Sequence, residues 1–128
     1  MPKARDVISK KVITVKKNTQ LKKICQLLIK NKISGVSVVD DKNRLIGYVS
    51  ERDIINALQK DMDFLKEKAS DIMTKKVIST TPDIPLYDVA KIFTNKPFKN
   101  IPVVGKDKKI IGVITRKDVI GKLLGQYY

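Results

Sequence analysis

The sequence is one pattern written twice, because a shift of 65 positions aligns its first half with its second half without a gap. The shift places residues 47–53 (GYVSERD) on residues 112–118 (GVITRKD), and residues 10–13 (KKVI) on the identical residues 75–78. Apolar positions recur in both copies: Leu21 with Leu86, Ile55 with Ile120 and Leu58 with Leu123. A duplication of this length determines the architecture before any single residue does. It predicts two pseudo-equivalent halves that share a core and a two-fold-like cleft.

The composition narrows the class of protein. With 128 residues, of which 42% are hydrophobic, the chain can bury about two thirds of its unfolded surface. No run approaches the roughly 20 apolar residues of a membrane span, and the first residues lack the apolar core of a signal peptide. We therefore expect a cytoplasmic protein with no membrane partner.

Charge and cysteine content narrow the partners. Lysine and arginine total 27 against 13 acidic residues, and the net charge of +14 attracts phosphates, nucleic acid or anionic surfaces. The lysines are scattered rather than gathered in one basic arm, so we interpret most of them as solvated surface. Cys25 is the single cysteine and histidine is absent, which excludes a disulfide framework and argues against a metal site. We interpret Cys25 as a small core residue.

The first half reads as strand, helix, strand, strand, helix. Residues 12–15 are rich in β-formers, and Asn18 offers an N-cap to a segment with apolar residues at helical spacing. Residues 36–39 and 45–49 then predict a hairpin. Ser50 opens the second helix of this half.

The second half repeats the same order. Residues 77–80 predict a strand and Asp83 an N-cap for the helix that follows. Residues 101–104 and 110–114 predict a second hairpin, and Thr115 opens the last helix. The pattern as a whole predicts an α+β fold.

The two halves are joined by a charged segment with apolar residues interspersed, which predicts a short helical connector. The expected boundaries are residues 1–60 for the first repeat, 61–69 for the connector and 70–128 for the second repeat. Each half alone is too small to hold a secure core, so we expect the two to depend on mutual packing.

The residues most suited to chemistry are Ser50 and Asp53, with Thr115 and Asp118 in the second copy. Each pair lies where a strand passes into a helix. A hydroxyl at the N-cap and an acid three residues later form a capping box, which is a purely structural explanation. The same junction offers free backbone N–H groups, a hydroxyl and a carboxylate, which can bind phosphate and ribose hydroxyls. The two interpretations are compatible.

From Ala4 to Leu124, the chain resembles a tandem pair of cystathionine-β-synthase (CBS) domains, also called a Bateman module. Individually weak motifs carry the resemblance through their order, spacing and duplication. In the first copy they are residues 12–15 (VITV), 33–40 (ISGVSVVD) and 47–53, and in the second copy residues 71–74 (DIMT), 77–83 (VISTTPD), 100–104 (NIPVV) and 112–118.

The resemblance implies two β-α-β-β-α repeats packed about a pseudo-two-fold axis as one compact module, with clefts that bind adenosine-containing ligands of the AMP, ADP or ATP class. It implies regulation rather than catalysis, with no required cofactor. Asp53 and Asp118 would hold ribose hydroxyls, with Ser50 and Thr115 against ribose or phosphate. The other implied site residues are Thr14, Gly35, Val36, Ser37, Ser79, Thr80, Asn100, Ile101 and Pro102 along the base pockets, and Arg52, Arg116 and Lys117 near phosphates.

The sequence departs from the family pattern at several positions. Ser37 stands where the family commonly has proline, and Asn100 stands in place of a small residue, so we expect Asn100 to narrow its pocket. In the first copy Ser50 is followed by one acidic and one basic residue (residues 51–52, ER). In the second copy Thr115 is followed by two basic residues (residues 116–117, RK). We therefore predict that the second cleft tolerates more phosphate charge than the first.

Three classes of function compete. An enzyme is the least supported, because no histidine base and no Gly-rich phosphate loop is present. A basic nucleic-acid-binding module fits the net charge but lacks a recognised motif and an aromatic stacking platform. A structural dimerisation module would use the apolar faces of the helices after Asp53 and Asp118. We favour a stand-alone sensor of adenine nucleotides that forms a homodimer and signals to an unidentified effector protein.

Overall fold

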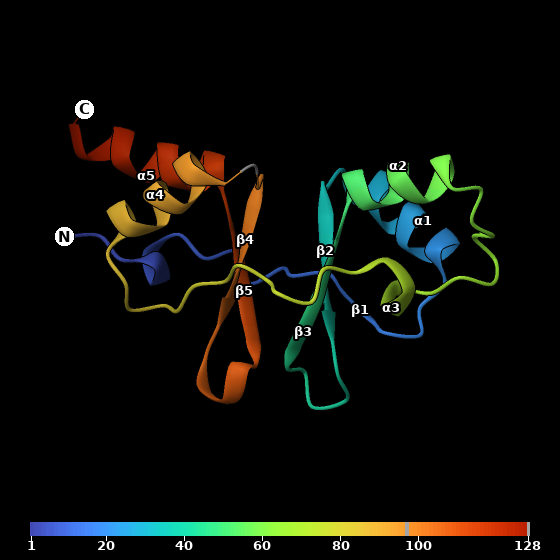
Figure 1. Cartoon of the computed structure of the whole chain (residues 1–128). Coiled ribbons are helices and arrows are strands. Elements are labelled where there is room, and N and C mark those ends of the chain that lie inside the picture. Colours follow the sequence, from blue (N-terminus) through green and yellow to red (C-terminus); the bar gives the residue numbers. More distant parts are fainter. Residues whose placement is uncertain (97, 128) are drawn as a thin grey trace. The chain divides into compact units, whose positions relative to one another are not determined.

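The computed structural model describes the backbone of residues 1–96 and 98–127 and the side chains of residues 1–96 and 98–125. Its elements follow one another as η1 (Ala4–Asp6), β1 (Thr14–Lys16), α1 (Leu21–Asn31), β2 (Gly35–Val39), β3 (Leu45–Ser50), α2 (Glu51–Gln59), α3 (Ala69–Ile72), α4 (Leu86–Asn95), β4 (Asn100–Val104), η2 (Lys106–Lys108), β5 (Ile110–Thr115) and α5 (Arg116–Tyr127), as Figure 1 shows. The mixture confirms the predicted α+β class. None of the helices in the described part of the chain is long and apolar enough to cross a membrane.

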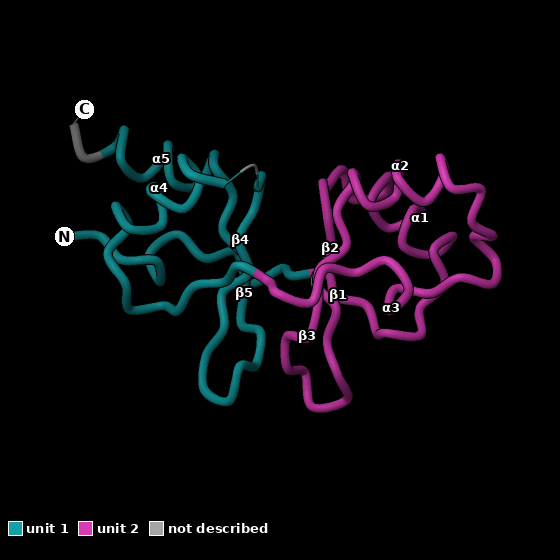
Figure 2. Tube along the Cα trace, viewed as in Figure 1, with its two compact units in different colours: residues 1–12, 78–128 teal, residues 13–77 magenta. Residues whose placement is uncertain are grey.

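The chain divides into two compact units whose limits differ from those of the sequence repeats. Unit 1 consists of residues 1–12 and 78–128, and unit 2 of residues 13–77 (Figure 2). The boundaries expected from the repeat follow the order of the sequence. In the packing, by contrast, the segment that leads into each repeat belongs to the unit built mainly from the other repeat.

Unit 2 contains a three-stranded sheet in the order β1-β2-β3, with β1 parallel and β3 antiparallel to β2. Helices α1 and α2 lie on the same side of this sheet (Figure 1). Its core comprises Val15, Leu21, Ile24, Leu28, Val36, Val38, Val49, Ile54, Ala57 and Ala69. Cys25 lies half-buried against this core, and burial raises the pKa of its thiol.

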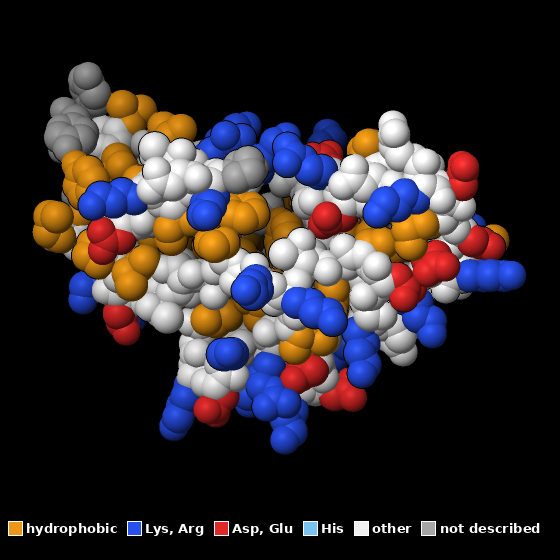
Figure 3. Space-filling model, viewed as in Figure 1, with side chains coloured by type: hydrophobic (Ala, Val, Ile, Leu, Met, Phe, Trp, Pro, Cys, Tyr) orange, Lys and Arg blue, Asp and Glu red, His pale blue; other side chains and the backbone are white. Residues whose placement is uncertain are grey.

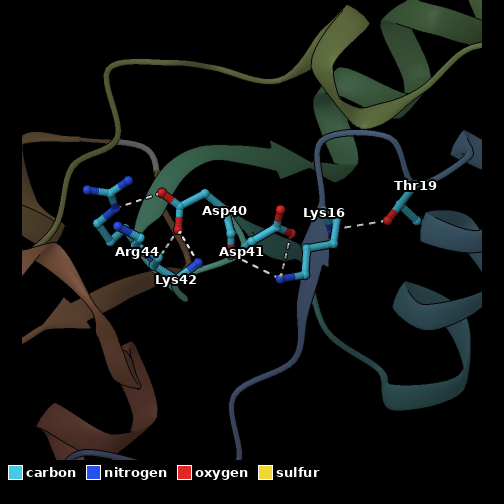
Figure 4. Close-up of polar contacts among 6 residues, drawn as sticks. All are labelled: Lys16, Thr19, Asp40, Asp41, Lys42 and Arg44. Atoms are coloured by element: carbon cyan, nitrogen blue, oxygen red, sulfur yellow. Dashed lines mark hydrogen bonds and ion pairs between the residues drawn. The ribbon is translucent and has the colours of Figure 1, made fainter.

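The predicted hairpin of unit 2 is present, and Asp40 fastens its turn. The Asp40 carboxylate accepts hydrogen bonds from the N–H groups of Lys42 and Arg44 at 2.9 Å each, and from the Arg44 guanidinium at 2.7 Å (Figure 4). The Arg44 N–H is the largest of several causes that hold the pKa of Asp40 below its usual value. Lys16 of β1 donates to the Asp40 carbonyl at 3.0 Å. The turn is therefore tied both to itself and to the neighbouring strand.

Helix α1 begins later than predicted, because Gln20 and not Asn18 is its N-cap. The hydroxyl of Thr19 accepts from the Lys16 N–H at 3.0 Å, and the Thr19 N–H donates to the Lys16 carbonyl at 3.1 Å. These bonds close a separate turn before the helix. The prediction of an N-cap at Asn18 is therefore wrong.

The prediction of a helical connector at residues 61–69 is also wrong. These residues form turns and irregular backbone until α3 begins at Ala69. Asp61, the second residue after the end of α2, adopts a left-handed backbone with φ 53°. The N–H of Met62 then bonds the carbonyl of Ala57 at 3.1 Å. Because Met62 and Phe64 pack against the core of unit 2, the segment is part of that unit.

Unit 1 contains the antiparallel pair β4-β5, with α4 and α5 on one side of it (Figure 1). Its separate core comprises Ala4, Leu86, Val89, Ile101, Val103, Ile114 and Val119. The prediction of a strand at residues 77–80 is wrong. Only one parallel bridge, between Thr80 and Val103, forms there. Pro102 stands where the first copy has Ser37, and its missing N–H prevents the ladder from extending.

Helix α4 begins after Pro85, so the prediction that Asp83 caps it is wrong. Asp83 instead forms an ion pair with Arg5 of the N-terminal segment. The hydrogen bond and positive charge of Arg5 hold the pKa of Asp83 below its usual value. The carboxylate therefore ties the first residues of the chain to unit 1.

Candidate functional site

The first candidate site lies at the junction of β3 and α2, where Ser50 and Asp53 form the predicted capping box. The Asp53 carboxylate accepts through Oδ2 from the Ser50 N–H at 2.8 Å and from the Ser50 hydroxyl at 3.0 Å. The Ser50 Oγ in turn accepts from the Asp53 N–H at 3.2 Å. Both side chains are half-buried. Local bonding thus sets the direction of this carboxylate in the absence of any ligand.

The second candidate site has the same frame at the junction of β5 and α5. The Thr115 N–H donates to Asp118 Oδ2 at 2.8 Å, and the Asp118 N–H donates to Thr115 Oγ1 at 3.2 Å. The hydroxyl-to-carboxylate bond found in the first copy has no counterpart among the bonds of the described residues here. The Thr115 hydroxyl therefore remains available as a donor.

Each carboxylate keeps one oxygen for other partners. Oδ1 of Asp53 and Oδ1 of Asp118 accept no hydrogen bond from the residues that the structure describes, since the cap uses Oδ2 in both copies. A carboxylate with a free oxygen and fixed orientation can accept hydroxyl donors such as the vicinal hydroxyls of a ribose. The capping role of each carboxylate is therefore compatible with the binding role predicted from the sequence.

The other first-copy candidates lie on adjacent strands near this junction. Thr14 faces Ser37 across β1 and β2, and Gly35 faces Ser50 across β2 and β3. A side chain at Gly35 would collide with the ring of Tyr48 unless that ring moved, which favours glycine at this position. Among the candidates on β2, Val36 is committed to the hydrophobic core and is a backbone candidate only.

The second-copy candidates are also brought together on strands. Asn100 faces Thr115 across β4 and β5, while the side chain of the next candidate, Ile101, is committed to the core of unit 1. Ser79 is half-buried, and the Thr80 N–H donates to the Pro102 carbonyl at 3.0 Å. These residues form one neighbourhood in unit 1.

Thr80 differs from its counterpart in the first copy. It is 6% exposed, and its Oγ1 is a buried side-chain oxygen without a hydrogen-bond partner in the described part of the chain. The repeat places Val15, a core residue of unit 2, at the equivalent position. The second copy thus carries a buried hydroxyl where the first copy carries a methyl group.

The predicted cations lie on the first turns of the two helices. Arg52, Arg116 and Lys117 are all exposed. Lys117 and Asp118 line a hollow of about 400 Å³, together with Val7, Gly121 and Lys122. Arg116 is not among the lining residues of this hollow.

The sequence interpretation missed three lining residues of this hollow. Val7 comes from the N-terminal segment, and only the packing of unit 1 brings it to α5. Gly121 and Lys122 come after the junction motif, which ends at Asp118 in the second copy. The sequence could have pointed to them through the mismatch between the copies, because the first copy has Asn56 and Ala57 at these two positions.

Positive charge is spread over both units. Unit 1 has 13 cationic and 5 acidic residues, a net charge of +8, and unit 2 has 14 and 8, a net charge of +6. Lysine and arginine side chains are scattered across the face seen in Figure 3 rather than gathered in one patch. The charge favours anionic ligands at either junction without selecting one.

Comparison with known sequences gives a consistent result. The model of the CBS domain matches residues 4–60 and 69–125. The chain is 36% identical to the uncharacterized protein MJ1225 of Methanocaldococcus jannaschii, over 94% of this chain and 42% of that protein. It is 31% identical to the uncharacterized protein MJ1426 of the same organism, over 91% of this chain and 89% of that protein. An inosine-5'-monophosphate dehydrogenase of Aquifex aeolicus is 38% identical over 84% of this chain but only 22% of the enzyme. The chain thus spans less than half of MJ1225 and about a fifth of the dehydrogenase.

Solved structures share the same fold over the full length of the chain. CBSX2 of Arabidopsis thaliana in complex with AMP is 29% identical, with a TM-score of 0.87 and complete coverage of both chains. The CBS domain pair of protein MJ0100 in complex with 5'-methylthioadenosine and S-adenosyl-L-methionine is 29% identical, with a TM-score of 0.85 and coverage of 100% and 99%.

Proposed function

Because the chain belongs to the CBS domain family as a tandem pair of these domains, we propose that it binds adenosine-containing ligands at its two strand–helix junctions and regulates a partner protein without catalysing a reaction. The observation that carries the proposal is the duplicated carboxylate: Asp53 and Asp118 are both half-buried, both oriented by a cap, and both left with a free Oδ1. A second pair of capping acids, Asp6 and Asp71, is also repeated in both halves, but these two are exposed, whereas Asp53 and Asp118 are half-buried.

The residues around each carboxylate fit the parts of a nucleoside. Asp53 would accept the ribose hydroxyls in unit 2, with Thr14 and Ser37 supplying polar groups for a base. Asp118 would play the same part in unit 1, with Ser79, Thr80 and Asn100 near the base. The ligands of two structural relatives, AMP in CBSX2 and S-adenosyl-L-methionine with 5'-methylthioadenosine in MJ0100, share an adenosine group. This shared group supports adenosine as the recognised part.

Regulation is the proposed role because the oriented carboxylates and the available Thr115 hydroxyl are suited to hydrogen bonding with a ligand. A ligand can shift the protein between arrangements only by its differential affinity for them. We propose that the change is read by an effector protein in the cytoplasm. No further cofactor is needed for binding of this kind.

Self-association is the second part of the proposal, and exposed apolar side chains on α2 and α5 support it. Ile55 is 54% exposed and its repeat counterpart Ile120 is 63% exposed, and each has an exposed leucine one turn further on. Figure 3 shows hydrophobic side chains on the surface over α5. We propose that a second copy of the chain covers these helix faces.

Calorimetric titration with adenosine, AMP, GMP and S-adenosyl-L-methionine tests the binding proposal. Substitution of Asp53→Asn or Asp118→Asn keeps an oxygen for the cap but removes the charge, so affinity for AMP at that junction should fall about tenfold to a hundredfold. Asp71→Asn and Asp6→Asn are matched controls, because these carboxylates cap Lys68 and Lys3 through the same bond at 2.8 Å. Equal losses in the controls would refute nucleoside recognition by the junctions, and equal affinity for GMP and AMP would refute recognition of the adenine base.

A further inference from the structure

The hollow beside α5 differs in charge from the equivalent region of the first copy. Its lining residues include Lys117, Lys122 and Asp118, whose formal charges sum to +1. Neither ammonium group makes a hydrogen bond or ion pair with any residue that the structure describes. Their charge is therefore available to an anion in the hollow.

The first copy has no such pair of cations. The repeat places Arg52 and Asp53 at the positions of Lys117 and Asp118, and Ala57 at the position of Lys122. These residues sum to zero charge, and Ala57 is 1% exposed within the core of unit 2. The side chain at the position equivalent to Lys122 therefore cannot contact a ligand at the first junction.

Glycine opens the hollow in the second copy. A Cβ atom built on Gly121 meets no heavy atom within 4 Å, whereas the repeat places Asn56 at this position in the first copy. Val7 forms an apolar wall from the N-terminal segment. A volume of about 400 Å³ lies within the range of small-molecule sites. The hollow thus combines space, an apolar wall and two unpaired cations beside the proposed ribose carboxylate.

We propose that this hollow receives the phosphate groups of a ligand whose ribose is held by Asp118, and that Lys122 makes the second junction selective for nucleotides with more than one phosphate. The inference rests on the function proposed above and adds its ligand class. Lys117 and Lys122 contact the phosphates, and Gly121 leaves room for them. Arg116, which is not among the lining residues of the hollow, contributes little.

The second junction is tested in the Asp53→Asn protein, because this substitution weakens binding at the first junction. Adenosine, AMP and ADP are titrated into this protein, and the affinity of each is measured. Lys122→Ala should lower the affinity for ADP about fivefold while the affinity for adenosine stays the same. Lys91→Ala is the matched control, because it removes an exposed lysine of unit 1 outside the hollow. The effect of Lys122→Ala should also shrink as salt is raised.

The outcomes separate the two proposals. If adenosine and AMP bind through Asp118 but Lys122→Ala behaves like Lys91→Ala, the phosphate assignment is overturned while nucleoside binding stands. If Arg116→Ala lowers ADP affinity and Lys122→Ala does not, the phosphates lie elsewhere and the assignment is again overturned. If neither adenosine nor AMP binds at all, both proposals fail. A second variant, Gly121→Leu, fills the hollow and should weaken ADP more than adenosine.

Discussion

Thr74 and Tyr48 exchange two backbone hydrogen bonds, of 2.9 and 3.0 Å, and these bonds join the lead-in segment of the second repeat to the sheet of the first. The repeat places Ser9 and Val113 at the equivalent positions, and they exchange bonds of 2.9 and 3.0 Å as well. Each lead-in segment therefore extends the sheet of the other repeat. A change in either segment must act on the unit that it completes and not on the repeat that it precedes.

The first prediction concerns Gly112, which lies against the lead-in segment. A Cβ atom at Gly112 would collide with Ile8 and would lie 2.7 Å from the Ser9 carbonyl oxygen. Because that oxygen belongs to backbone held by the bridge to Val113, Gly112→Ala should destabilise the protein by about 2 kcal/mol. Chemical denaturation measures the change.

Two further glycines calibrate this prediction. Gly47→Ala should cost less, because the nearest atom is in the flexible side chain of Met73 rather than in backbone. Gly125→Ala, in α5 with nothing within 4 Å of the added carbon, should stabilise the protein by about 0.5 to 1 kcal/mol. Equal effects at Gly112 and Gly125 would contradict the close packing of the lead-in segment.

The parts of the fold that could be predicted from sequence depend on neighbours along the chain. The hairpins follow from alternating strand residues, and the caps at Ser50 and Thr115 from an acid three residues later. Asn18 and Asp83 mislead because other local bonds compete: the turn closed by Thr19 comes before α1, and Asp83 pairs with Arg5. A good capping residue is only a candidate until its competitors are known.

The parts that could not be predicted depend on contacts between distant residues. Ser9 lies 104 positions before its partner Val113, and no periodic pattern in either segment announces the pairing. The hollow has the same origin, because Val7 meets Lys117 and Lys122 only after the N-terminal segment has joined unit 1. The duplication revealed both junctions, but the structure was needed to find the cation at Lys122.

The second prediction concerns the buried hydroxyl of Thr80. Since Oγ1 has no partner among the described residues, its burial costs the desolvation of a polar group. Thr80→Val removes the hydroxyl and keeps the shape, so it should stabilise the ligand-free protein by about 1 kcal/mol in urea denaturation. The control is Thr19→Val, which deletes an acceptor bonded to the Lys16 N–H and should destabilise. A loss of stability in Thr80→Val would mean that the hydroxyl has a partner in solution.

The third prediction concerns acid pH and Asp40. Because the Arg44 N–H and the other donors lower the pKa of Asp40 in the folded state, its contribution to stability is fully present above the pKa of an unfolded Asp, about 3.9, and is lost as the pH falls through the lower pKa of the folded state. Asp40→Asn should therefore make stability depend less steeply on pH between about 4 and 2. Denaturation at several pH values measures the slope.

The matched control for Asp40 is in the other hairpin. Asp107→Asn removes an acid from the loop between β4 and β5, where its side chain makes no hydrogen bond or ion pair with the described residues. This substitution should leave the pH slope closer to that of the wild type. The assignment to Asp40 would be refuted if the two variants changed the slope equally.

The last prediction concerns self-association through α2 and α5. Burying an exposed isoleucine contributes about 1.5 to 3 kcal/mol, and a lysine in its place would have to be desolvated at the interface. Ile120→Lys or Ile55→Lys should therefore weaken the dimer at least about tenfold in sedimentation equilibrium. Ile29→Lys is the control, because Ile29 is 79% exposed but lies on α1, outside the proposed face. A wild-type protein that stays monomeric, or an equal loss with Ile29→Lys, would show that these helix faces do not join two copies.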